Sequence, residues 1–206
     1  MSPTQKLNSV LLTLIVLLLL SGLTGCAVNK SKSVPLCSTS KEKGLEPGLD
    51  VLYFKDFYRH VREMPYGRGA QIQGRPGKPI LMLNHRFGKG EVFDSGRSRG
   101  VGVQMSGFIN FSVPGPYVFM ARSNDGVRVY INGEVIVKDE DVHSERDSEP
   151  GTIEINKPCW YPIEVRYFQR KGSAAIGLYW KEPGASRFTV VPAEAYAHMP
   201  RSTETK

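Results

Sequence analysis

The sequence predicts an all-β fold, an antiparallel two-sheet β-sandwich or barrel. Between about Gly48 and Ala197, short runs rich in Val, Ile, Phe and Tyr are separated by Gly, Pro, Asn and Asp, without sustained helical periodicity. Within Tyr161–Gln169, apolar side chains alternate with Glu and Arg, which is the pattern of a half-buried antiparallel strand. The Asn132-Gly133 pair between two such runs is typical of a tight β-hairpin.

Eight segments carry the clearest strand patterns. They are Leu49–Phe57, Val101–Ser112, Tyr117–Arg122, Val127–Ile131, Val135–Lys138, Gly151–Ile155, Tyr161–Arg170 and Ala174–Trp180. Because successive side chains of a strand point to opposite faces, one of Tyr179 and Trp180 should belong to the core. The Gly-, Arg-, Pro- and Gln-rich segment Met64–Lys78 predicts a long insertion or surface loop.

The N-terminus is typical of an export signal. Lys6 precedes an almost unbroken apolar run from Val10 to Leu20, which is short for a membrane anchor that needs roughly 20 apolar residues. The following Leu23-Thr24-Gly25-Cys26 resembles the lipobox of bacterial lipoproteins. This resemblance implies cleavage before Cys26 and lipidation of that cysteine with acyl chains such as palmitate. An ordinary signal peptide cut elsewhere, with Cys26 a bystander, is the alternative.

These features divide the chain into four parts. We expect a signal peptide at 1–25, a lipidated polar tether at 26–47, the β-sandwich at 48–197 and a polar C-terminal tail at 198–206. Ala27 is not acidic, and in bacteria with two membranes this resembles the default for sorting to the outer membrane. The expected location is therefore an exported protein held to a bacterial membrane by lipid.

Two cysteines remain if Cys26 carries lipid. An exported protein meets an oxidising compartment in many bacteria, so we predict a disulfide between Cys37 and Cys159. Two free buried thiols are the alternative.

Composition and charge narrow the classes of partner. The 206 residues include 40% hydrophobic residues, which excludes a wholly disordered chain, and 27 Lys plus Arg against 20 Asp plus Glu give a formal charge of +7. Basic residues concentrate in Arg59–Lys89, whereas Asp139–Glu149 is acidic and predicts a solvated loop. Export makes nucleic acid an unsuitable partner.

A series of strand and turn motifs resembles the PA-fourteen domain, a β-sandwich module named after a fragment of anthrax protective antigen. The motifs are Pro114-Gly115-Pro116-Tyr117-Val118-Phe119, Arg122-Ser123-Asn124-Asp125-Gly126, Asn132-Gly133, Tyr161–Phe168 and Ile176–Trp180, and the resemblance runs from about Gly48 to about Tyr196. It implies a PA-fourteen type sandwich, often with carbohydrate-binding activity.

The resemblance also implies where a ligand would bind. Some adhesins of this family hold calcium, and through it sugar, with two consecutive aspartates joined by a cis peptide and an asparagine from a later loop. The matching residues are Asn124 and Asp125, so one carboxylate is replaced by an amide, and the later loop carries Arg170 and Lys171. Calcium is therefore an open alternative to a structural turn, and no cofactor is required. The residues predicted for ligand binding are Asn124, Asp125, Gly126, Gln169, Arg170 and Lys171.

The chain shows no motif for nucleophilic, phosphate-binding or metal-dependent catalysis. The sequence therefore predicts a cell-envelope lipoprotein with one non-catalytic module that recognises a glycan. The alternative is a structural or assembly lipoprotein that contacts another envelope protein.

Overall fold

A computed structural model describes residues 44–201. The predictions for the signal peptide, for Cys26 and for Cys37 lie outside these residues. Cys159 is described and is buried at 6% exposure, so its pairing with Cys37 stays a prediction. Within residues 44–201, no helix has the length and apolar character needed to cross a membrane.

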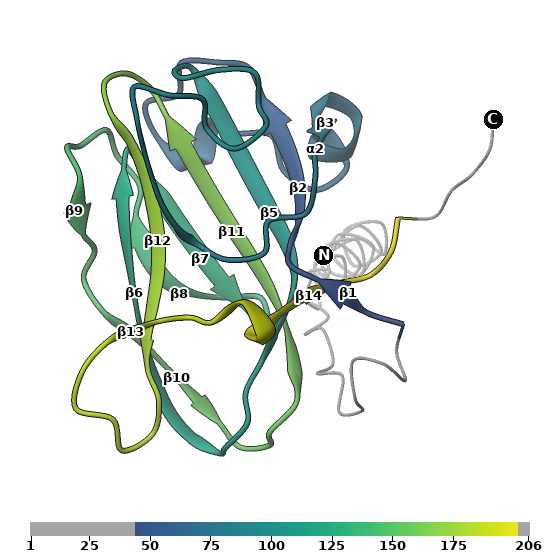
Figure 1. The fold of residues 1–206 in the computed structure, drawn as a ribbon, viewed down its shortest axis with the longest axis vertical. Helices are drawn as coiled ribbons and strands as arrows, with labels where there is room; N and C mark the ends of the chain where they lie inside the picture. Colours follow the sequence, from purple (N-terminus) through teal and green to yellow (C-terminus); the bar gives the residue numbers. More distant parts are fainter. Residues whose placement is uncertain (1–43, 202–206) are drawn as a thin grey trace, which may run out of the picture. The chain divides into compact units, whose positions relative to one another are not determined.

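Two antiparallel sheets form the described part of the chain, as predicted (Figure 1). The eight-stranded sheet has the order β1-β14-β5-β11-β7-β8, with β2 paired to β5 and β3 paired to β2. Its strands are β1 Glu46–Pro47, β2 Asp50–Phe54, β3 Arg75–Pro76, β5 Val101–Asn110, β7 Val127–Ile131, β8 Glu134–Asp139, β11 Trp160–Gln169 and β14 Tyr196–His198.

The six-stranded sheet has the order β10-β6-β12-β13, with β4 paired to β12 and β9 paired to β6. Its strands are β4 Asn84–Gly88, β6 Gly115–Asn124, β9 Arg146–Asp147, β10 Gly151–Ile155, β12 Ala174–Lys181 and β13 Thr189–Val190. The helical elements are η1 Val61–Glu63, α2 Gly67–Gln73 and η2 Ala193–Ala195. Each of the eight predicted strand segments overlaps a strand of the structure.

The predicted hairpin is confirmed between β7 and β8. Asn132 and Gly133 have φ values of 53° and 78°, the left-handed region that a two-residue turn of this kind requires. Asparagine and glycine tolerate this conformation better than other residues, so the turn follows directly from the local sequence.

The main core lies between the sheets and contains a cluster of aromatic rings. Trp180 on β12 is 5% exposed and its ring centroid lies 5.4 Å from that of Tyr117 and 6.0 Å from that of Phe119, both on β6. Phe111 contacts the same group, at 4.5 Å from Tyr117. Trp180 is therefore the core member of the Tyr179-Trp180 pair, and Tyr179 lies on the outer face of the sheet.

The segment Met64–Lys78 is not only a surface loop. It contains α2, whose Ala70 is fully buried, and Met64 is 1% exposed. Both belong to a second apolar cluster with Leu52 and Phe54, the β2 residues that point away from the main core. The sequence does not predict this helix because a seven-residue element with two glycines is too short to show a helical period of apolar residues.

The acidic stretch Asp139–Glu149 is also more ordered than a solvated loop. Glu140 is 5% exposed and forms an ion pair with Arg128. Asp139 is bonded to Arg146, with 2.9 Å between Oδ2 and Nε. Arg146 belongs to the stretch itself, but Arg128 lies on β7, so the charge run alone could not predict the burial of Glu140.

Candidate functional site

The predicted ligand residues Asn124, Asp125 and Gly126 form the connection between β6 and β7. The peptide bond between Asn124 and Asp125 is cis. The Asp125 N–H donates to the carbonyl oxygen of Phe168 at 3.1 Å, and the Phe168 N–H donates to that of Gly126 at 3.0 Å. The connection is thus bonded to the end of β11, and the structure brings the two predicted segments together.

The Asp125 carboxylate is buried and is held by backbone amides. The residue is 2% exposed, and its Oδ2 accepts the Arg170 N–H at 2.7 Å. Burial raises the pKa of this carboxyl, while backbone N–H groups of Arg170, Lys171 and His143 lower it. One side chain therefore joins three segments, the β6–β7 connection, the β11–β12 loop and the acidic stretch.

Gln169 is also turned inward. It is fully buried, and its Nε2 donates to the carbonyl oxygen of Lys171 at 2.9 Å. The hydroxyl of Tyr167 donates to the Asn124 carbonyl oxygen at 2.6 Å. Of the predicted set, Lys171 is exposed and Asn124 and Arg170 are partly exposed. Ligand binding by this set stays a prediction.

The cis peptide between Asn124 and Asp125 matches the calcium centre that the family resemblance implies, but the charge of the pair does not, and calcium binding there stays a prediction. The one carboxylate in the pair, that of Asp125, already accepts backbone N–H groups, and two basic residues follow Gln169. Within residues 44–201, no group of three or more His, Cys, Asp or Glu side chains is arranged to hold a metal ion. A calcium site relies on several oxygen ligands and on carboxylate charge, and the Asn124-Asp125 pair supplies a single carboxylate.

A second cluster of polar side chains lies on the outer face of the six-stranded sheet. Strand β12 places the small residues Ala175 and Gly177 on this face, followed by Tyr179. In the strand register, Gly177 lies opposite Asn84 of β4 on one side and Arg122 of β6 on the other. Because the middle strand has no large side chain at these positions, a hollow of about 240 Å³ remains. We call it the sheet-face hollow; its lining residues are Asn84, His85, Arg86, Arg122, Ala175, Ile176, Gly177 and Tyr179.

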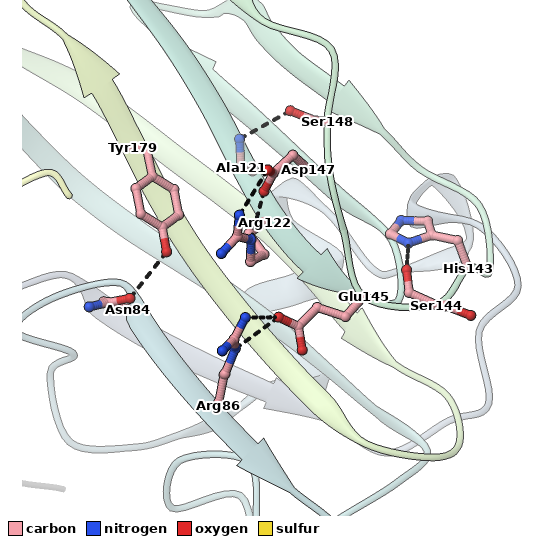
Figure 2. Close-up of polar contacts among 10 residues, drawn as sticks. All are labelled: Asn84, Arg86, Ala121, Arg122, His143, Ser144, Glu145, Asp147, Ser148 and Tyr179. Carbon is pink, nitrogen blue, oxygen red and sulfur yellow. Dashed lines mark hydrogen bonds and ion pairs between the residues drawn. The ribbon is translucent and has the colours of Figure 1, made fainter. Parts of the chain in front are cut away.

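The groups around the sheet-face hollow are fixed by one another (Figure 2). The Tyr179 hydroxyl donates to Asn84 Oδ1 at 3.2 Å. Arg122 donates to Asp147 through two parallel bonds, of 2.7 Å from Nε and 2.8 Å from Nη2. On the other side Arg86 Nε donates to Glu145 Oε1 at 2.8 Å.

The acidic stretch supplies both carboxylates of this cluster. Ser148 fixes the stretch to β6, because it accepts the Ala121 N–H on its hydroxyl at 3.0 Å and donates its own N–H to the Ala121 carbonyl oxygen at 2.8 Å. The hydrogen bonds from Arg122 lower the pKa of Asp147, so this carboxyl is charged at neutral pH.

The sequence did not mark Asn84, Arg122, Asp147 or Tyr179 as ligand-binding residues. The signal in the sequence was the outward series Ala175, Gly177 and Tyr179 of β12, which consists of two small residues and one aromatic residue. Whether such a series is open to a ligand depends on the side chains of the neighbouring strands. Those neighbours come from residues 84, 122 and 147, and their pairing depends on strand register.

The fold is an antiparallel two-sheet β-sandwich with a cluster of polar groups on the outer face of one sheet. The model of the PA14 domain family matches residues 87–194, and the chain therefore belongs to that family. This confirms the resemblance to the PA-fourteen domain. No curated protein matches the chain.

Solved structures share the fold at low sequence identity. An anti-sigma factor domain-containing protein from Clostridium clariflavum is 19% identical with a TM-score of 0.61, over 78% of this chain and 50% of that one. The PA14 domain of the MpAFP antifreeze protein is 14% identical with a TM-score of 0.57, over 85% and 100%. The A domain of Epithelial Adhesin 9 from Candida glabrata, solved with Galβ1-4GlcNAc, is 10% identical with a TM-score of 0.59, over 82% and 97%. The chain spans about half the length of the anti-sigma factor proteins that it matches.

Proposed function

We propose that this protein is a lipid-anchored, non-catalytic module of a bacterial cell envelope that binds a carbohydrate. The observation that carries this proposal is the PA14 sandwich, which the chain shares with an adhesin domain solved in complex with a disaccharide. Polar side chains that converge on the sandwich surface support the proposal, because a few placed polar groups orient a ligand such as a saccharide through hydrogen bonds.

Carbohydrate binding should not require calcium. We expect the full chain, purified in a detergent without a sugar headgroup, to bind the same oligosaccharides on a glycan array in EDTA and in calcium above the roughly 0.1–1 mM range of weak extracellular sites. The physical reason is that the Asp125 carboxylate already accepts backbone N–H groups. A calcium-dependent lectin on the same array checks that EDTA has removed the ion.

Two other results on the glycan array would contradict different parts of the proposal. Binding that appears only with calcium would restore the calcium hypothesis at Asn124 and Asp125. A chain that binds no oligosaccharide in either buffer would contradict the proposed function itself.

The anchor is proposed to be a lipid on Cys26. We expect cells fed labelled palmitate to label the full chain, Cys26→Ser to abolish the label and Cys37→Ser to retain it. Each buried methylene contributes about 0.8 kcal/mol, so several acyl chains hold a protein on a membrane. Equal labelling of wild type and Cys26→Ser would mean that the lipobox is not used.

A protein-binding role is the second candidate, favoured by one observation. The insertion exposes two large apolar side chains, Tyr66 at 69% and Ile72 at 73%. Both belong to α2 or its N-cap, and exposed apolar surface is typical of contacts between proteins. Chemical cross-linking of the wild type to another envelope protein, lost in Ile72→Ser, would favour this role. The wild type would then also bind no glycan.

A further inference from the structure

We propose that the sheet-face hollow binds one uncharged sugar unit of a glycan, with the sugar ring against Tyr179 and its hydroxyl groups bonded to Asn84 and to the Arg122–Asp147 pair. This inference rests on the proposed carbohydrate-binding function and locates the site. It places the ligand on the outer face of the six-stranded sheet rather than at the β6–β7 connection.

Size is the first argument. The hollow of about 240 Å³ lies below the roughly 300–1,000 Å³ of sites for drug-sized ligands, which suits a single sugar ring better than a nucleotide or cofactor. Ala175 and Gly177 are small residues of its lining, and the Tyr179 ring lies against Gly177, so a ligand meets that ring rather than the glycine.

The position of Tyr179 is the second argument. A Cβ atom at residue 177 would lie 2.9 Å from a ring carbon of Tyr179, so the glycine lets this ring lie close against the strand. The bond to Asn84 holds the hydroxyl of Tyr179 in place. An aromatic ring that lines a hollow and is fixed in advance provides apolar contact area at little entropic cost, and one face of a pyranose is apolar.

Charge and hydrogen bonding give the third argument. Two arginines, Arg86 and Arg122, stand against two carboxylates, Glu145 and Asp147, so these paired charges cancel. Arg122 uses two N–H groups on Asp147 and keeps others, while the carboxylate keeps free lone pairs. A hydroxyl group both accepts and donates, so a diol can bond to both partners without breaking their ion pair. A charged ligand would find no uncompensated charge in these two pairs.

The outer face of the eight-stranded sheet offers a matched comparison. Tyr130 on β7 is also partly exposed and lies beside arginines, with Arg128 and Arg166 at 5.7 and 5.5 Å from its ring centroid. Its hydroxyl accepts a hydrogen bond from Arg128 at 2.8 Å. Tyr130→Ala therefore removes the same kind of side chain in a similar setting, outside the sheet-face hollow.

The test uses the full chain in a detergent without a sugar headgroup. The glycan array holds neutral and acidic oligosaccharides, including Galβ1-4GlcNAc. The oligosaccharide that binds most strongly is titrated into the wild type and four variants, Tyr179→Ala, Arg122→Ala, Tyr130→Ala and Lys171→Ala. We expect Tyr179→Ala and Arg122→Ala each to weaken binding at least tenfold, and Tyr130→Ala to change Kd less than twofold. Between about 0.05 and 0.5 M salt, Kd should also change less than twofold, because the ligand is uncharged.

Several outcomes would overturn the proposal. Unchanged affinity in Tyr179→Ala, with loss in Lys171→Ala, would place the site at the β11–β12 loop and leave the proposed function intact. A steep loss of affinity with salt, or selection of acidic glycans alone, would exclude an uncharged sugar. A wild type that binds no glycan would overturn the site together with the function. Unfolding by urea checks that each variant is folded. Arg122→Ala should pass this check, because ion pairs of partly exposed side chains contribute only about 0–1 kcal/mol to stability.

Discussion

Replacing Trp180 by alanine should lower the free energy of unfolding by about 3–5 kcal/mol. Trp180 is 5% exposed and its ring contacts those of Phe111, Tyr117 and Phe119. Alanine would leave a large cavity between the two sheets, and a close-packed interior relaxes only in part around such a gap. Urea unfolding of the full chain, followed by circular dichroism, measures the loss.

The neighbouring residue supplies the control. Tyr179 is adjacent in sequence and similar in size, but it lies on the outer face and is partly exposed. Tyr179→Ala should change the free energy of unfolding by less than about 1 kcal/mol, as substitutions on the surface usually do. A loss below about 1.5 kcal/mol in Trp180→Ala, or equal losses in both variants, would contradict the assignment of Trp180 to the core.

This contrast also marks what the sequence can predict. Alternation along β12 establishes that residues 179 and 180 face opposite ways, because the period of a strand is two. The hairpin at Asn132-Gly133 is equally local, since it depends on two residues that accept positive φ. Both of these predictions need only neighbours in the chain, and the structure confirms both.

The sheet-face hollow shows where such reasoning ends. Strand β4, Asn84–Gly88, was not predicted because an edge strand with polar outward residues has no apolar run. Gly177 meets Asn84 and Arg122 only through strand register, which is set by tertiary pairing. Asp147 then reaches Arg122 from a stretch that the sequence assigns simply to an acidic loop.

The predicted ligand residues show a different limit. The family resemblance correctly brought the β6–β7 connection and the β11–β12 loop together, since the Asp125 carboxylate accepts the Arg170 N–H. Sequence could not show that this carboxylate is buried and held by backbone amides, because that depends on how the chain from His143 packs against it.

The second large effect is expected at Asp125. Asp125→Ala should lower the free energy of unfolding by about 2–4 kcal/mol, because it leaves the backbone N–H groups of Arg170, Lys171 and His143 with no carboxylate to accept them in a buried place. Asp125→Asn should cost roughly half as much, since its amide oxygen still accepts and its neutral side chain avoids the burial of charge that raises the pKa of the aspartate.

Asp56 provides a matched control in an exposed setting. Its carboxylate also accepts a backbone N–H, that of Phe57 at 2.6 Å, but the residue is exposed. Asp56→Ala should therefore change the free energy of unfolding by less than about 0.5 kcal/mol. Hydrogen exchange at the amides of Arg170 and Lys171 should accelerate in Asp125→Ala and stay unchanged in Asp56→Ala.

Calcium decides between the two roles of this carboxylate. An ion bound only to the folded chain stabilises it by RT ln(1 + [L]/Kd), which is about 2.7 kcal/mol when calcium is at 100 times its Kd. If Asp125 serves only to accept backbone amides, added calcium leaves the unfolding midpoint of the wild type unchanged. A calcium-dependent rise that Asp125→Asn abolishes would instead make the carboxylate a metal ligand, and the amide contacts would then describe the metal-free chain.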